Sequence, residues 1–115
     1  MQLREIVKQL DLQIIAGANL LEREATGCYV SDMLSDVMAH ANSGDVWVTL
    51  QVHLNIIAVA SVNGISALII VNDRSLDDAT IKKATEEKVP VLVTTLNAFQ
   101  IAGKLYQLGL GEKDA

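Results

Sequence analysis

Residues 26–53, TGCYVSDMLSDVMAHANSGDVWVTLQVH, are the stretch that decides the fold of this 115-residue chain. Short apolar runs alternate in it with turn signals, which predicts a strand over residues 27–30, a helix over 31–41, a turn over 42–44 and a second strand over 45–50. A strand, a helix and the next strand within about twenty residues are typical of a parallel βα unit. The stretch also contains the only Cys, the only Trp and both His residues, so it is the first place to look for a functional site.

The polar residues around the first helix have structural explanations. Ser31 is expected to cap its N-terminus, and Asp32 to lie in its first turn, where the helix dipole favours a carboxylate. Gly44 is expected to end the turn after the helix. The apolar face that should pack on the sheet consists of Leu34, Val37, Met38 and Ala41.

The alternation continues towards the C-terminus and gives about four βα units. Residues 53–62 predict a second helix, the continuous apolar run 67–71 a central strand, residues 77–88 a polar helix and residues 90–93 a fourth strand. Thr95 is expected to cap a last helix. The inward face predicted for that helix consists of Phe99, Ala102, Leu105 and Leu108.

A short helix and a strand come before these units. The apolar spacing over residues 3–10 predicts an amphipathic helix, residues 12–16 a brief strand, and residues 19–25 a loop. Right-handed crossovers between parallel strands then place helices on both faces of one sheet. The predicted fold is a three-layer α/β/α domain with a mostly parallel sheet, and residues 1–115 are expected to form this single domain.

Composition narrows the class of protein. Half the residues are hydrophobic and 20% are charged, as in globular domains. Nine Lys and Arg residues against fourteen Asp and Glu residues argue against a nucleic-acid partner, which clustered cations would bind. A single cysteine excludes an internal disulfide and a cysteine zinc site. No signal-peptide pattern opens the chain and no apolar run could span a bilayer, so we expect a cytoplasmic protein without a membrane partner.

The second helix suggests an oligomer. Almost every position of residues 54–62 is apolar, which leaves the helix without a polar face. A helix that is apolar all round has to be buried all round. We therefore expect a homodimer, and the alternative is that the N-terminal helix covers it within one chain.

A rim at the carboxyl ends of the strands is the candidate ligand site. Ligands of open α/β sheets bind there, and helix N-termini at this edge point N–H groups towards an anion. The alternative is that these residues are ordinary caps and loop residues. The tentative ligand-binding residues are Ser31, Asp32, Thr49, Gln51, His53, Asn72, Arg74, Thr94 and Thr95.

Motifs for a specific chemistry are missing from the sequence. Asp32, Asp36 and His40 share one helical stripe, but the stripe is roughly 12 Å long, too long for one metal ion. His53 with Asp45 or Asp32 suggests acid–base chemistry, yet no Gly-x-Ser-x-Gly nucleophile motif accompanies it. Neither a phosphate loop nor a Gly-x-Gly-x-x-Gly motif is present. Cys28 reads as a buried thiol, and we expect no metal, no cofactor and no catalytic residue.

The sequence resembles the DRTGG-domain family over essentially its whole length. The resemblance is carried by Thr-Gly-x-Tyr-Val-Ser-Asp-x-Leu-Ser-Asp-Val-Met from Thr26, by Gly-Asp-x-Trp-Val-Thr from Gly44, and by Pro-Val-Leu-Val-Thr-Thr from Pro90. The Asp-Arg-Thr-Gly-Gly run that names the family is absent, and the nearest match is Arg-Glu-Ala-Thr-Gly over residues 23–27.

The resemblance implies an α/β domain similar to the N-terminal domain of HPr kinase/phosphorylase. It also implies a regulatory or dimerising role, as in the pyrophosphatases, phosphotransacetylases and cobyrinic-acid synthases that carry such domains. The kinase domain with its phosphate loop is missing, so kinase activity does not follow.

Three functions are compatible with the sequence. The first is a non-catalytic regulatory or interaction module that dimerises. The second is a sensor that binds a nucleotide or another anion at the strand-end rim. The third, which we rank last, is a small hydrolase or phosphotransferase that uses His53 and Asp32.

Overall fold

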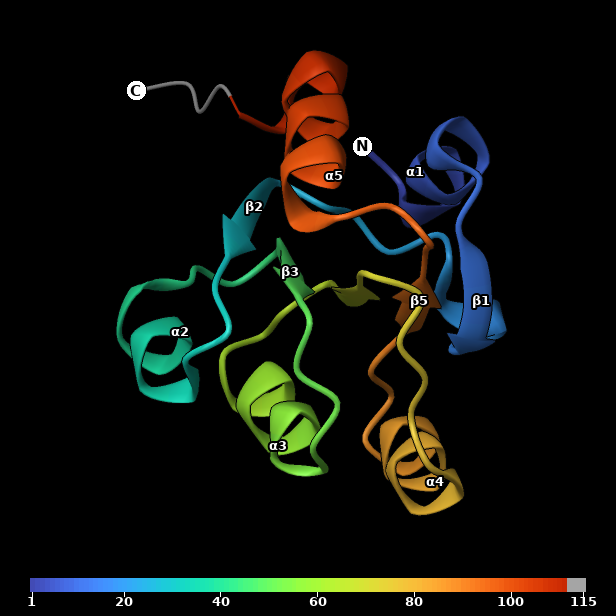
Figure 1. Ribbon diagram of the computed structural model, residues 1–115, viewed down its shortest axis with the longest axis vertical. Helices are drawn as coiled ribbons and strands as arrows, with labels where there is room; N and C mark the ends of the chain where they lie inside the picture. Colours follow the sequence, from blue (N-terminus) through green and yellow to red (C-terminus); the bar gives the residue numbers. More distant parts are fainter. Residues whose placement is uncertain (112–115) are drawn as a thin grey trace.

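The computed structural model describes residues 1–111, which form a three-layer α/β/α structure (Figure 1). The helices are α1 (Leu3–Leu10), α2 (Leu34–His40), α3 (Asn55–Val62), α4 (Asp78–Glu86) and α5 (Ala98–Leu105), with a 3-10 turn, η1 (Ala18–Leu20), and a π-helical turn, η2 (Tyr106–Leu110). The strands are β1 (Gln13–Ala16), β2 (Gly27–Val30), β3 (Asp45–Thr49), β4 (Ala67–Ile70) and β5 (Val91–Val93).

The five strands form one sheet in the order β1-β5-β4-β3-β2. Strands β2, β3, β4 and β5 are parallel to one another, and β1 pairs with β5 in the antiparallel direction. Because each crossover from β2 to β5 moves one strand in the same direction, the right-handed rule places α2, α3 and α4 on one face. Helices α1 and α5 cover the other face (Figure 1). The predicted fold class is thus confirmed.

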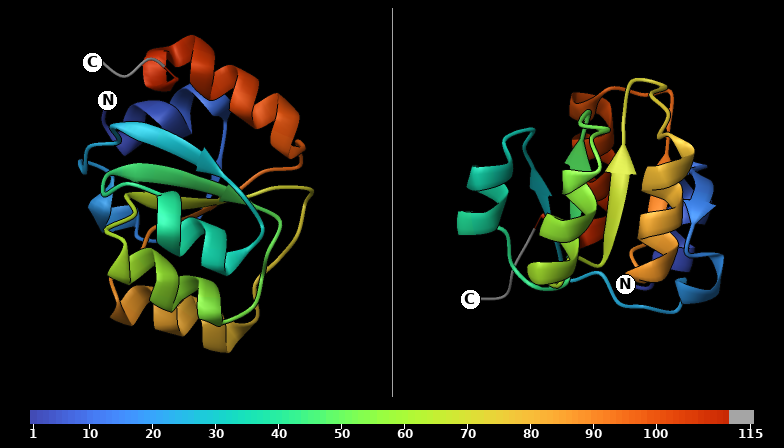
Figure 2. Two further views of the ribbon diagram at one scale, coloured as in Figure 1. Left: turned by 90° about the vertical axis from the view of Figure 1, so that its left-hand side faces the viewer. Right: turned by 90° about the horizontal axis from the view of Figure 1, so that it is seen from below.

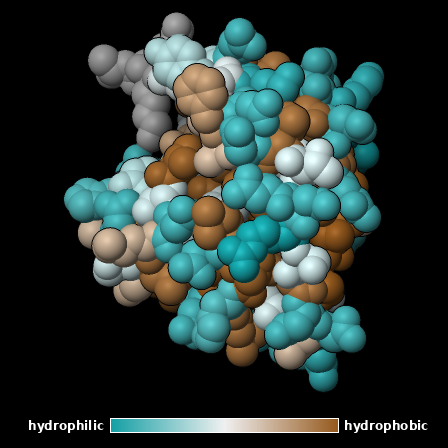
Figure 3. Space-filling view, viewed as in Figure 1, coloured by the Kyte–Doolittle hydropathy of each residue, from teal (hydrophilic) through white to brown (hydrophobic). Residues whose placement is uncertain are grey.

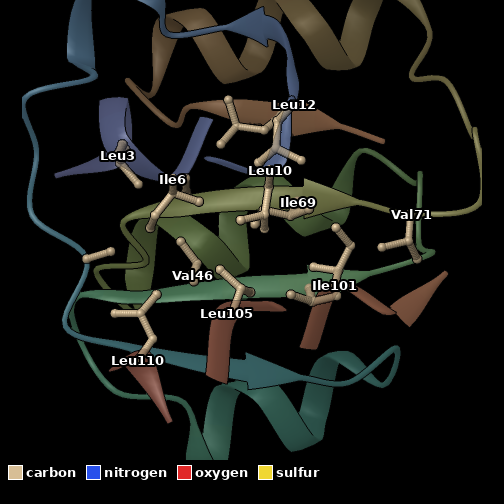
Figure 4. Close-up of a cluster of buried hydrophobic side chains, with 14 of the residues drawn as sticks. Leu3, Ile6, Leu10, Leu12, Val46, Ile69, Val71, Ile101, Leu105 and Leu110 are labelled. Carbon is tan, nitrogen blue, oxygen red and sulfur yellow. The ribbon is translucent and has the colours of Figure 1, made fainter. Parts of the chain in front are cut away.

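The core lies on both faces of the central strands β3 and β4, which are buried at every position. Their side chains alternate between the two faces, as the pleat of a strand requires. Val46 and Ile69 pack under α1 and α5, in a cluster with Ile6 and Leu105 (Figure 4). Trp47, fully buried, packs on the opposite face against α2 to α4. The continuous apolar run 67–71 is therefore a central strand covered on both faces, as expected.

Helix α2 begins later than predicted, and the expected cap is wrong. The structure starts the helix at Leu34, after Met33, without a side-chain cap. The Ser31 hydroxyl accepts a hydrogen bond from the Met33 amide (3.2 Å), a local turn that holds the chain out of helical geometry. Asp32 is therefore outside the helix. Of the predicted apolar face only Val37 is fully buried, and Met38 is 57% exposed. This short helix lies near the edge strand β2 and not over the centre of the sheet (Figure 1).

Helix α5 also begins later than predicted. Asn97, and not Thr95, caps it: Asn97 Oδ1 accepts from the Gln100 amide (2.9 Å), and Gln100 Oε1 accepts from the Asn97 amide (3.0 Å). This reciprocal capping box fixes the first turn. Ile101 and Leu105 are the buried residues of the helix, whereas Phe99 is 86% exposed, so its predicted inward position is wrong.

Helix α3 is the apolar helix of the prediction, and it is not buried all round. Its neighbours are the sheet, α2 on one side and α4 on the other (Figure 1). A stripe of Leu54, Ala58 and Val62 remains exposed, with Val62 at 81%. The alternative that α1 covers α3 is also wrong, since α1 lies on the opposite face of the sheet (Figure 2).

Candidate functional site

The predicted rim residues lie at the carboxyl edge of the sheet, where the arrowheads in Figure 2 point. Figure 3 looks onto this edge and shows mostly hydrophilic side chains across its middle, with hydrophobic ones between them. The edge consists of the segments that follow β2, β3, β4 and β5. It divides into two halves with different partners.

The first half is a hydrogen-bonded network around Asp32, which we call the Asp32 network (Asp32, Thr49, Leu50 and Gln51). Asp32 Oδ1 accepts from the Thr49 hydroxyl (2.8 Å) and from the Leu50 amide (2.9 Å). Gln51 donates from its side-chain amide to the Asp32 carbonyl (3.1 Å) and from its backbone to the Thr49 hydroxyl (3.1 Å). Thr49 is almost fully buried (1% exposed), so this network joins the end of β3 to the turn after β2.

Ser31 belongs to the same corner of the molecule. Its carbonyl accepts from the Trp47 indole N–H (2.8 Å), which satisfies a polar group on a fully buried side chain. Hydrogen bonds hold the pKa of Asp36 below its usual value, and the largest contribution comes from Ser31, followed by Tyr29. His40 also contacts this carboxylate (Nδ1 to Oδ1, 3.1 Å).

The helical stripe of Asp32, Asp36 and His40, considered for a metal and judged too long, is split in the structure. Asp32 bonds to β3, and Asp36 pairs with His40 on the exposed side of α2. Within residues 1–111, no three His, Cys, Asp or Glu side chains lie close enough to hold a metal ion. In the same part of the chain, no helix has the length and apolar character to cross a membrane.

The second half of the edge joins the segments after β4 and β5. The Asn72 amide donates to the Leu96 carbonyl (2.9 Å), and the Asp73 amide donates to the Thr94 carbonyl (3.0 Å). Asn72 and Asp73 both have left-handed backbones (φ +64° and +55°), an uncommon conformation for residues other than glycine. Thr94 also accepts from the Leu96 amide (3.2 Å), and Thr95 is exposed.

A topological switch point lies in this second half. The chain passes from β4 to α4 on one face and from β5 to α5 on the other, the arrangement that opens a ligand crevice in many α/β proteins. The two hydrogen bonds described above close much of the gap. A hollow of about 200 Å³ lies beside the switch point, where β1 begins and β5 ends, and is lined by Asp11, Gln13, Asp73, Val93, Thr94 and Thr95.

His53 and Arg74 complete the predicted set and are both exposed. Helix α3 begins at Asn55, two residues later than predicted, and His53 lies just before it, where its Nδ1 accepts from the Asn55 amide (3.1 Å). Arg74 makes no ion pair with another residue of the described part of the chain. The structure brings Ser31, Asp32, Thr49 and Gln51 together and joins the segments that contain Asn72 and Thr94 through backbone hydrogen bonds. His53 hydrogen-bonds to a backbone amide and not to a nucleophile.

Two hollows elsewhere were not predicted from the sequence. One, about 490 Å³, lies between β2 and the end of α5 and is lined by Cys28, Val30, Ala102, Tyr106, Leu110 and Gly111. Burial, with a smaller contribution from the charge of Asp45, raises the pKa of the Cys28 thiol to about 12. Cys28 was predicted to be a buried thiol, and in the structure it is half-buried and lines this hollow.

The other hollow, about 410 Å³, lies at the amino ends of β3, β4 and β5, opposite the predicted rim. Arg23 lines it, in the Arg-Glu-Ala-Thr-Gly run that replaces the family signature. That run was the one signal in the sequence that pointed to this edge. Ligands of α/β sheets usually bind at the carboxyl ends of the strands, so no site was predicted at the amino edge.

Comparisons with known proteins agree with the fold. A family model described as the DRTGG domain matches residues 5–108. The structure is similar to that of the CBS and DRTGG domains of the regulatory region of Clostridium perfringens pyrophosphatase, which was solved in complex with its activator, diadenosine tetraphosphate. The TM-score is 0.71 at 16% identity, over 98% of this chain and 51% of that one, so this chain spans about half of its neighbour's length. No curated protein matches the chain.

Proposed function

This chain belongs to the DRTGG domain family, and from that premise we propose that it is a regulatory module that acts as a homodimer and has no catalytic centre of its own. The observation that carries the proposal is the unpaired, apolar edge of the sheet at β2. The pyrophosphatase region with the same fold is itself named as regulatory, which supports the first part. The proposal places the protein in the cytoplasm, where a free thiol such as that of Cys28 stays reduced.

Strand β2 is an edge that lacks the usual protection. Its sequence, Gly-Cys-Tyr-Val, contains no charged residue and no proline, the residues by which proteins commonly prevent edge strands from pairing. Apolar side chains are exposed around it: Val30 at 47%, Met33 at 64% and Tyr106 at 60%. The opposite edge, β1, differs, because its pairing register shifts between Ile14 and Ala16.

A second copy of the chain fits this edge. A two-fold axis beside β2 would pair the strand with itself in the antiparallel direction, so that each edge satisfies the free backbone groups of the other. The hollow between β2 and α5 would receive apolar side chains of the partner, since Val30 and Tyr106 line it. A stable interface of this kind buries about 800 Å² on each subunit, and the strand edge together with the end of α5 offers a continuous surface for it.

Light scattering coupled to size-exclusion chromatography tests the dimer. The wild-type chain is expected to elute as a dimer at micromolar concentration, and Val30→Lys as a monomer, because a lysine on an edge strand blocks pairing. Val62→Lys is the matched control, since it places the same charge on an exposed apolar residue of α3. Circular dichroism would show that both variants are folded.

The oligomeric states of the two variants distinguish the β2 edge from the exposed stripe of α3 as the dimer interface. A wild-type monomer across the micromolar range contradicts the proposal. A monomeric Val62→Lys beside a dimeric Val30→Lys would move the interface to the exposed stripe of α3, and the β2 edge would be wrong.

A ligand sensor at the carboxyl-edge rim is the second candidate, favoured by the switch point between β4 and β5. A thermal-shift screen of nucleotides, with diadenosine tetraphosphate among them, tests it, because a ligand that binds the folded state raises the melting temperature. We rank it second because Asp11 and Asp73 line the hollow there and disfavour an anion. Unchanged melting temperatures at millimolar ligand would contradict it.

Catalysis by His53 and Asp32 is ranked below both. The Asp32 carboxylate already accepts two hydrogen bonds from the fold, and the His53 ring accepts one from a backbone amide. If an activity is found, its full retention in His53→Ala would exclude this mechanism.

A further inference from the structure

We propose that the hollow at the amino edge of the sheet binds a small oxyanion, a phosphate or carboxylate group carried by a metabolite. This site, which we call the amino-edge pocket, is formed around Arg23 and Lys88. It lies at the end of the sheet opposite the arrowheads in Figure 2 and shares no residue with the predicted rim. The inference is independent of the dimer proposed above.

The walls of the amino-edge pocket are held by the backbone. The Gly44 amide donates to the Gly64 carbonyl (2.8 Å), and the Ser66 amide donates to the Asp45 carbonyl (2.8 Å). A side chain at Gly64 would meet the Ser43 hydroxyl at 2.6 Å, and the φ of +67° there also favours glycine. The pocket is thus preformed by tight turns, a condition that lowers the entropic cost of binding.

The charges in the pocket do not cancel. Glu24 is paired with the amino group of Met1 (2.8 Å), and Glu87 is paired with Lys83 (3.1 Å). Within residues 1–111, Arg23 and Lys88 have no carboxylate partner. Two cations without a carboxylate partner therefore line a hollow whose two acidic side chains each pair with another cation.

Arg23 is positioned for a ligand by the fold. One guanidinium nitrogen donates to the Ser66 carbonyl (3.4 Å), which anchors the half-buried side chain at the pocket wall. The other donors of the guanidinium fork stay available for an oxyanion, which arginine recognises through paired N–H groups. The hydroxyls of Ser43 and Ser61 add uncharged donors, while that of Ser66 already donates to the Glu24 carbonyl (2.8 Å).

Lys88 has a left-handed backbone conformation that glycine adopts more easily than lysine does. Its φ is +57°, in the left-handed turn that ends α4, where glycine or asparagine is usual. A non-glycine residue in this conformation is uncommon, and departures from a local preference are common at functional sites. An oxyanion held between Lys88 and Arg23 supplies the missing reason.

The size and lining of the pocket limit the ligand. A hollow of about 410 Å³ is within the range of small-molecule sites. Ala60, Ile65 and Val89 give it apolar walls, and no aromatic residue lines it on which a nucleobase could stack. A compact metabolite with one or two oxyanion groups and a short apolar part fits best.

A titration followed by amide NMR spectra tests the site. Inorganic phosphate and succinate are titrated separately into the full chain, each against sodium chloride at equal ionic strength. Saturable shifts are expected at the amides of Gly44, Gly64 and Ser66. Binding of phosphate alone identifies a phosphorylated ligand, binding of succinate alone identifies a carboxylate, and binding of both supports the shared oxyanion chemistry.

Three variants make the result decisive. Arg23→Gln and Lys88→Gly should each weaken binding about tenfold, the usual effect of losing one charged donor. Lys88→Gly should also fold with an equal or higher melting temperature, because glycine fits the left-handed backbone, so its loss of binding is not a loss of structure. Lys104→Gln, which removes an exposed cation of α5, is the control and should bind as the wild type does.

Absence of saturable shifts for both probes, or equal binding by wild type and Lys88→Gly, overturns the proposal.

Discussion

Replacing Asp32 by alanine tests whether the Asp32 network belongs to the fold. The substitution removes the acceptor of two hydrogen bonds, from the Thr49 hydroxyl (2.8 Å) and from the Leu50 amide (2.9 Å). The two donors differ in their access to water. Thr49 is 1% exposed, whereas the bond from Leu50 lies at the surface.

The expected loss of stability in Asp32→Ala follows from this difference in exposure. A buried donor left without its acceptor costs about 1–3 kcal/mol, and water replaces the acceptor of an exposed donor for about 0.5 kcal/mol or less. We therefore expect Asp32→Ala to lower the free energy of unfolding by about 2 kcal/mol, with a fall in melting temperature of roughly 8 °C for a domain of this size. Asp32→Asn keeps an acceptor oxygen but loses the charge, so about 1 kcal/mol is expected for it.

Urea unfolding followed by circular dichroism measures both changes, provided that the m-values match. Glu86→Ala is the control, since the Glu86 side chain is exposed and makes no hydrogen bond or ion pair within residues 1–111, and its effect should stay within about 0.5 kcal/mol of zero. An Asp32→Ala variant as stable as this control would refute the reasoning. In that case the carboxylate would be free for a ligand.

Three further predictions concern other positions. Cys28, with a thiol pKa of about 12 against an ordinary 9.0, should react with iodoacetamide at pH 8 about a thousandfold more slowly in the folded than in the urea-unfolded protein; equal rates would contradict its burial. Hydrogen bonds lower the pKa of Asp36, so they add stability above its unfolded value of 3.8 that is lost as the pH falls through the lower folded value. Tyr29→Phe removes one of these bonds (2.9 Å), so the stability difference between wild type and variant should shrink below pH 4 in acid-unfolding curves; a constant difference would exclude the linkage. Asp77→Ala removes the cap of α4, whose side chain accepts from the Thr80 amide (2.8 Å), and should cost about 1 kcal/mol in urea unfolding, with no change if the cap is unimportant.

The fold was predictable because its signals are periodic and local. The stripe of Leu3, Ile6 and Leu10 gave α1, and the apolar run of β4 gave the central strand. Packing is less local. Phe99 fits the spacing of an inward face, yet the capping box begins the helix after Asn97, and the side of α5 that meets the sheet is then occupied by Ile101 and Leu105.

Part of the site was predictable for the same reason. Parallel strands end at one edge, so Ser31, Asp32, Thr49 and Gln51 had to converge. The partners of Asp32 were not predictable, because the helix dipole and the Thr49 hydroxyl are both good partners for a carboxylate, and only the position of β3 beside β2 decides between them. The amino-edge pocket was not predicted because its residues come from four separate segments of the chain, and no sequence spacing indicates that Arg23 and Lys88 line one hollow.

The two edges of the sheet differ in how their polar groups are used, and this difference ranks the candidate sites. At the carboxyl edge the polar side chains of Asp32 and Thr49 form hydrogen bonds within the fold, and the hollow in the other half of that edge is lined by two carboxylates. At the amino edge Glu24 and Glu87 each pair with another cation, whereas Arg23 and Lys88 have no carboxylate partner within residues 1–111. A binding site needs groups that the folded chain has not already satisfied, since a ligand gains little from a donor or acceptor that must first give up a partner. By that criterion Arg23 and Lys88 are better placed to hold a ligand than the rim that the fold class alone would select.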